Sequence, residues 1–116
     1  MAVGHAYQPG SDAEKSLDAA TSGTGTVKAL NHCRMVEWRT DYSGTVSGGT
    51  IIIEYAHAAD YPQTWSQLAS IAAANLAAGT DGFGVTDGLR PFVRARISAT
   101  ITGGGNVTVR LNGVLD

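Results

Sequence analysis

The sequence has a single cysteine, few charged residues and no long hydrophobic run, and each shortage excludes a class of protein. Because Cys33 has no second cysteine to pair with, no internal disulfide can hold the fold together. No stretch approaches the ~18 consecutive apolar residues of a membrane span. The first residues lack a basic start followed by an apolar core, so we expect no signal peptide and folding in a reducing cytoplasm.

Charge is scarce as well. Only 16% of the 116 residues are charged and the net charge is −2. Such a balance gives no electrostatic drive toward nucleic acid or an anionic membrane, so we expect neither as a partner. The exposed surface must consist mainly of Ser, Thr, Gly, Asn and Ala. A surface of this kind suits a protein that is covered by partners, and it suits a small stable monomer equally well.

The clearest pattern in the chain is a pair of strand-like segments joined by glycines, over residues 91–115. Apolar and polar residues alternate along both segments, which places one set of side chains on a core face. The link Gly103-Gly104-Gly105-Asn106 tolerates the positive φ of a tight reversal. The pattern predicts a β-hairpin, with these residues on its core face: Val93, Ala95, Ile97, Ala99, Ile101, Val107, Val109 and Leu111.

Other short strands precede this segment. Residues 34–39 and 50–58 are predicted strands, with Val36, Trp38, Ile51 and Ile53 facing inward. Residues 41–44 predict a turn, and the glycine-rich residues 79–88 predict a loop.

The stretch 65–78 is ambiguous, because its spacing and alanine content fit a helix while its neighbours are strands. We favour a strand. Several short strands with glycine-rich turns predict an all-β protein, an antiparallel β-sandwich for which we expect jelly-roll winding.

Residues 1–26 contain almost no large apolar side chains. Such a segment cannot offset its own ordering entropy by burial within itself. It is either a disordered tail or an extended arm that becomes ordered on a neighbour, with Tyr7 and Leu17 as anchors. We therefore divide the chain into an extended N-terminal arm, residues 1–26, and a β-sandwich domain, residues 27–116.

No group of residues predicts catalysis or metal binding. His5, His32 and His57 lie far apart and lack the close spacing of a metal site. Glu54 and His57 are three residues apart on one strand, so their side chains point to opposite faces and cannot form an acid–base pair. Cys33 is expected to be a buried, inert thiol. We therefore expect a protein that is not an enzyme and has neither a cofactor nor a metal.

Aromatic and basic residues supply the candidates for contact with a partner. Core filling explains Trp38 and Tyr55 well, whereas Tyr61 and Trp65 lie in or beside a loop. Charged residues are common on a solvent-exposed strand face, and this ordinary explanation also applies to Arg94 and Arg96. The candidate partner-binding residues are Tyr7, Leu17, Tyr61, Trp65, Arg94 and Arg96.

Several segments in succession carry a family resemblance: GTIIIEY at 49–55, Asp60, Trp65, FVRARI at 92–97 and VTVRLNG at 107–113. Over about residues 44–113 the chain resembles small β-sandwich proteins of tailed-bacteriophage virions. These include capsid decoration (cement) proteins and related jelly-roll modules of tail proteins. The resemblance implies an antiparallel jelly-roll that binds other virion proteins without doing chemistry.

On this resemblance we expect a decoration protein on the capsid surface of the virion. Its partner would be the major capsid protein, and it would act as a homo-oligomer, a trimer on threefold axes. The alternative is a carbohydrate- or receptor-binding module of a tail fibre or tail tip. A cement protein needs an adhesive arm, whereas a glycan binder needs exposed aromatic rings beside polar loop residues.

Overall fold

The computed structural model describes residues 4–5, 15–30, 33, 35–73, 82–87 and 91–115. These residues contain no α-helix, and no helix among them is long and apolar enough to cross a membrane. The strands of this part of the chain are β1 (Gly4–His5), β2 (Lys15–Ala20), β3 (Gly23–Thr24), β4 (Lys28–Ala29), β5 (Met35–Ser43), β6 (Gly48–Ala56), β7 (Ser66–Ala72), β8 (Gly82–Asp87), β9 (Phe92–Thr102) and β10 (Asn106–Leu115).

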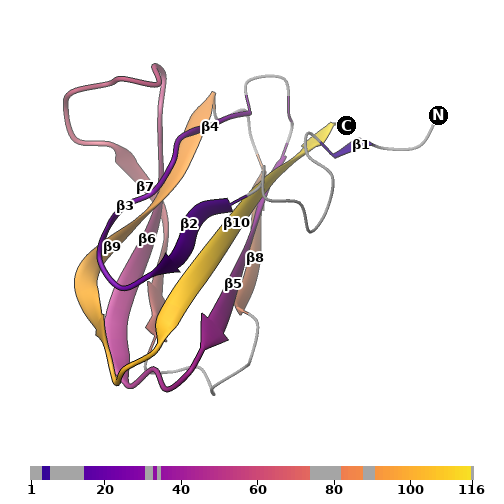
Figure 1. Cartoon of the computed structure of the whole chain (residues 1–116). Coiled ribbons are helices and arrows are strands. Elements are labelled where there is room, and N and C mark those ends of the chain that lie inside the picture. The colour runs from indigo at the N-terminus through magenta and orange to yellow at the C-terminus, as the bar shows by residue number, and fades with distance from the viewer. Residues whose placement is uncertain are drawn as a thin grey trace.

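The strands form two antiparallel sheets that pack face to face (Figure 1). Sheet A has the order β1-β10-β5-β8, and β2 also pairs with β10. Sheet B has the order β3-β9-β6-β7, and β4 also pairs with β9. The predicted all-β antiparallel sandwich is therefore confirmed.

Strands from the two halves of the chain pair in a nested order. β2 pairs with β10, β3 and β4 pair with β9, β5 pairs with β8, and β6 pairs with β7. Successive pairs alternate between sheet A and sheet B. The longer ladders β5–β10 and β6–β9 join these pairs within each sheet. Among the described strands, β6 and β7 are the only sequence neighbours that pair with each other.

The core lies between the sheets and is built from the inward side of the alternating strands. The predicted inward residues of β5 and β6 are confirmed, since Val36, Ile51 and Ile53 are fully buried and Trp38 packs against the core. In β9 and β10 the buried hydrophobic residues are Val93, Ala95, Ile97, Ile101, Val107, Val109 and Leu111. Ala99 is exposed, contrary to prediction, near the point where the β6–β9 register shifts.

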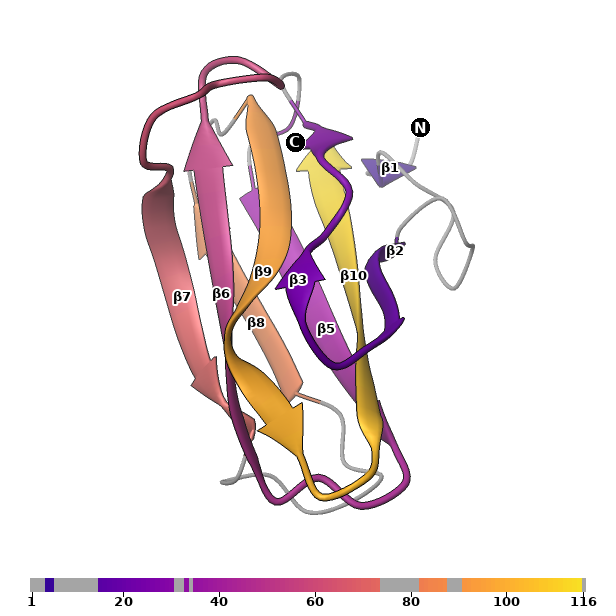
Figure 2. The same cartoon turned by 60° about the vertical axis from the view of Figure 1, so that its left-hand side comes forward.

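The predicted hairpin at residues 91–115 is wrong. β9 belongs to sheet B and β10 to sheet A, so the link at 103–105 crosses from one sheet to the other (Figure 2). This link lies against a second crossing, residues 44–47 between β5 and β6. The amide of Gly105 donates to the Thr45 carbonyl at 2.7 Å, and the amide of Ser47 donates to the Thr102 carbonyl at 2.8 Å. Period-two alternation and positive-φ glycines fit a crossing as well as a hairpin.

Three further segments can be compared with the sequence predictions. The strand expected within 65–78 is confirmed as β7, Ser66–Ala72, and residues 74–78 lie outside the described residues. The loop expected at 79–88 is wrong, because Gly82–Asp87 forms β8 and pairs with β5 along the edge of sheet A. The turn expected at 41–44 is also wrong, since β5 continues through Ser43.

The boundary between arm and domain at residue 26 is wrong as well. Residues 15–24 provide β2 to sheet A and β3 to sheet B, and Leu17 is only 4% exposed, within the core. The polar composition of residues 1–26 predicted a separate arm. Residues 15–24 instead pair with β10 and β9 and share the core of the sandwich, so they need no core of their own. Tyr7 and most of residues 1–14 lie outside the described residues.

Candidate functional site

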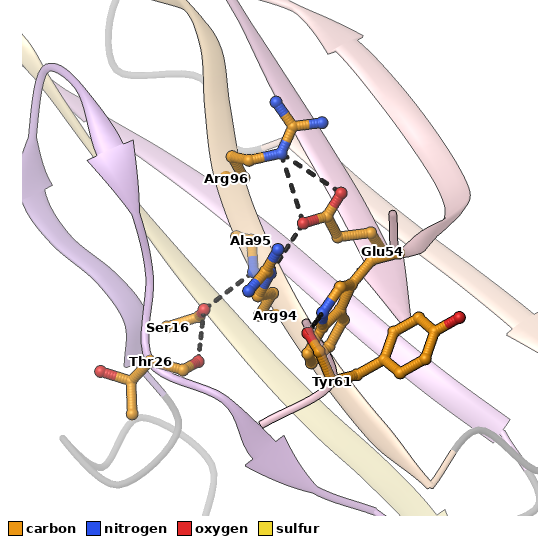
Figure 3. A network of polar contacts seen from close by, with 8 residues as sticks. Ser16, Thr26, Glu54, Tyr61, Arg94, Ala95 and Arg96 are labelled. Carbon is orange, nitrogen blue, oxygen red and sulfur yellow. Dashed lines mark hydrogen bonds and ion pairs between the residues drawn. The ribbon is translucent and has the colours of Figure 1, made fainter. Parts of the chain in front are cut away.

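The outer face of sheet B brings together four of the residues expected to contact a partner. Arg94 and Arg96 bind the carboxylate of Glu54 on β6 (Figure 3). Trp65 packs over Arg94 and is hydrogen-bonded to the Tyr61 carbonyl. We call this cluster the arginine face, and its members are Glu54, Tyr61, Trp65, Arg94 and Arg96. Of the remaining two candidates, Leu17 is buried in the core and Tyr7 lies outside the described residues.

Strand register explains why these charges meet. β6 and β9 run antiparallel, with Glu54 opposite Arg94 and Ile52 opposite Arg96. Since alternate residues of β9 fill the core, the two arginines between them point to the outer face of the sheet. Cross-strand pairs of opposite charge on one face stabilise a sheet.

Glu54 is the centre of the cluster. Its side chain is 3% exposed, and Oε2 accepts a hydrogen bond of 2.7 Å from Nε of Arg94. Nε of Arg96 lies 3.3 Å from both Oε1 and Oε2. A buried carboxylate is tolerated only when cations or hydrogen-bond donors compensate it, and here two guanidinium groups do so.

Trp65 covers one side of the cluster. Its ring lies over the guanidinium of Arg94, with the guanidinium carbon 4.0 Å from the ring centre, and its Nε1 donates to the Tyr61 carbonyl at 3.0 Å. The side chain is 5% exposed, so it fills space within this chain and offers no exposed ring to a partner. Tyr61 is half-buried, and its ring centre lies 4.8 Å from that of the exposed His57.

The N-terminal segment holds the same stretch of β9 from its other edge. Oγ of Ser16 accepts from the Ala95 amide at 2.9 Å and donates to the Thr26 carbonyl at 2.8 Å. The amide of Gly25 donates to the Ala95 carbonyl at 2.8 Å. Ala95 separates the two arginines, so residues 15–26 fix the backbone from which both side chains extend (Figure 3).

Replacing Ser16 with alanine is expected to lower the free energy of unfolding by about 1–3 kcal/mol, because the buried Ala95 amide loses its acceptor. Urea denaturation of the purified variant measures the loss. Ser22 of the same segment is exposed, and Ser22→Ala is the matched control, with an expected change within about 0.5 kcal/mol. Equal effects of the two substitutions would contradict the role of the Ser16 hydroxyl.

The arginine face can bind a hydrogen-bond acceptor through the guanidinium N–H groups of Arg94 and Arg96. In the part of the chain that the structure describes, no group of three or more His, Cys, Asp or Glu side chains could hold a metal ion. Cys33 is buried, as predicted, and burial raises the pKa of its thiol.

Comparisons with protein-family models, with curated proteins and with solved structures find no match for this chain. The fold and the site therefore define its class by themselves: an all-β sandwich with a preformed charged cluster on one outer face.

Sequence reasoning missed two residues of this site. Strand alternation separates Glu54 from His57 but does not reveal the cationic partners of Glu54, and it predicts no role for Ser16. The signal for Glu54 was present, since an acidic residue within an apolar strand needs a cationic partner on a neighbouring strand. No local pattern marks Ser16, because its partners lie on β9 and beyond β3.

Proposed function

We propose that this chain is a structural protein of a bacteriophage virion, a capsid decoration protein that binds the major capsid protein and acts by contact without catalysis. The observation that carries the proposal is the nested order of strand pairing. The resemblance of residues 44–113 to virion β-sandwich proteins points in the same direction.

The strand order supports the jelly-roll interpretation. A jelly-roll arises when a long antiparallel ribbon is wound so that successive strand pairs fall alternately in two packed sheets. The pairs β2–β10, β3–β9, β5–β8 and β6–β7 follow this order. Jelly-rolls are frequent among viral capsid proteins and lectins, so the winding favours a binding or structural role.

One surface feature supports assembly with other chains. β7 forms one edge of sheet B, and it contains no charged residue and no proline. Edge strands of monomers are usually protected by such residues, so this edge suits coverage by a neighbour. The resemblance adds the threefold arrangement, and we propose a homotrimer at the capsid surface.

The alternative role, a carbohydrate- or receptor-binding module of a tail, has less support. Sugar-binding sites present open aromatic rings, whereas Trp65 is buried against Arg94. Tyr61, the other aromatic member of the arginine face, is half-buried and lies beside His57.

The test is gold labelling of virus particles purified from the cells that make this chain, with an antibody raised against the purified protein. We expect gold on the particle heads in numbers that are similar from particle to particle. Gold confined to the tail tip would support the alternative role. Unlabelled particles in a lysate that contains the protein in quantity would overturn both. Sedimentation gives the stoichiometry independently, and a strict monomer at high micromolar concentration contradicts the trimer.

A further inference from the structure

The arginine face carries a surplus of positive charge. One guanidinium is sufficient to neutralise the Glu54 carboxylate, yet two arginines converge on it. The net charge of the whole chain is −2, so the surplus at the arginine face is opposite in sign to the overall charge. The second arginine is therefore not explained by the burial of Glu54 alone.

The outer face of sheet A shows what a balanced cluster looks like in the same molecule. There Arg39 and Arg110 both pair with Asp41, at 3.2 Å and 2.5 Å. Glu37, on the same face of β5, accepts from Asn112 of β10 at 3.3 Å and adds a second carboxylate. Among the described residues, the arginine pair on the outer face of sheet A thus lies with two carboxylates, whereas the pair on sheet B lies with one.

The two arginines of this face also carry N–H groups that do not bind Glu54. Both arginines hold Glu54 through Nε, and a guanidinium carries four more N–H groups on its two Nη atoms. Within the described residues, no side chain accepts a hydrogen bond from these Nη atoms. Figure 3 shows the Nη atoms of Arg96 pointing away from Glu54. The side chains of Arg94 and Arg96 are 22% and 37% exposed, so a partner can reach them.

Both guanidinium groups are ordered before any partner arrives. Arg94 is held between Glu54 and the Trp65 ring, and Arg96 is held by Glu54. The backbone between them is fixed through the Ser16 hydroxyl. An exposed arginine normally loses rotamer freedom when it binds, and side chains that are already held lose less.

We propose that the arginine face binds an acidic segment of a partner protein, in which an Asp or Glu carboxylate accepts hydrogen bonds from the Nη atoms of Arg94 and Arg96. The planar guanidinium matches the two oxygens of a carboxylate. A single surplus charge suits one or two carboxylates, whereas a nucleic acid needs an extended basic track. The inference does not rest on the virion role, because it requires only an acidic segment.

The test is an NMR titration of the full-length protein with a tetraglutamate peptide blocked at both ends. We expect the Nε–Hε signals of Arg94 and Arg96 to move with the added peptide, and those of Arg39 and Arg110 to stay. Arg96→Gln should weaken binding at least fivefold, while Glu54 keeps its bond to Arg94. Arg96→Lys retains the charge without the planar fork and should also bind more weakly than the unmodified protein.

Arg39→Gln on sheet A is the matched control, and peptide binding should be unchanged in it. Equal weakening by Arg39→Gln and Arg96→Gln would overturn the proposal, since binding would then follow net charge. Inorganic phosphate and a short oligothymidylate are titrated in parallel. If either moves the Arg94 and Arg96 signals at lower concentration than the peptide does, the assignment to a protein carboxylate is wrong.

Discussion

Replacing Leu17 with alanine is expected to lower the free energy of unfolding by about 2–5 kcal/mol. Leu17 is 4% exposed and belongs to the core cluster, and it lies opposite Val109 in the ladder between β2 and β10. Truncation would remove buried methyl groups and leave a cavity between the sheets. An anchor on a separable arm would instead leave the stability of the domain unchanged.

Urea denaturation followed by tryptophan fluorescence measures this loss. Asp18→Ala is the matched control in the same strand, because Asp18 is exposed and its pair with Lys15 lies at the surface. Exposed ion pairs contribute little, so the control should change stability by less than about 1 kcal/mol. If the two variants are equally stable, β2 is not an integral part of the sandwich.

Replacing Gly105 with alanine is expected to destabilise the fold by about 2–3 kcal/mol through overpacking. A Cβ atom at this position would lie 2.6 Å from the carbonyl oxygen and 2.9 Å from the amide nitrogen of Thr45. These are backbone atoms of the neighbouring crossing, so the two links at this end of the sandwich would have to separate. The hydrogen bond from Gly105 to Thr45 would be strained or lost with them.

Gly104 supplies the matched control for this substitution. Its φ is +96°, and a Cβ atom there would meet nothing within 4 Å. Gly104→Ala therefore carries only the backbone cost of a left-handed conformation, about 1 kcal/mol. Thermal unfolding of the two variants should rank Gly105→Ala as the less stable. The reverse order would favour an isolated hairpin turn, in which the positive-φ glycine matters most.

The sequence predicted which face of each strand is buried, but it did not predict which strands pair with each other. Alternation placed Val93, Ala95 and Val109 in the core correctly, because period two is a local property of the chain. Whether β9 and β10 share a sheet depends on the ladders that each forms with β6 and β5, many residues away. The glycines at 103–105 suit both outcomes, so they do not distinguish a hairpin from a crossing between sheets.

The candidate site was likewise predictable only in part: the sequence indicated most of its residues but not the contacts between them. Alternation put Arg94 and Arg96 on one outer face, and loop position selected Tyr61 and Trp65. The two arginines converge on Glu54, which lies 40 residues before Arg94 and which no local spacing links to them. Trp65 was expected to be available to a partner, and its burial depends on Arg94 beneath it.

The nested pairing of the strands has a consequence for how the chain folds. Apart from β6 and β7, the paired strands described here are distant in sequence, and folding slows as contacts become less local. We expect the β6–β7 ladder to form first and the remaining pairs to close outward from it. β10 pairs with β1, β2 and β5, yet it is synthesised after all of them. β1 and β2 therefore cannot be joined to β5 on the ribosome until β10 has emerged, and until then the edge of β5 that β10 will cover is open to other chains.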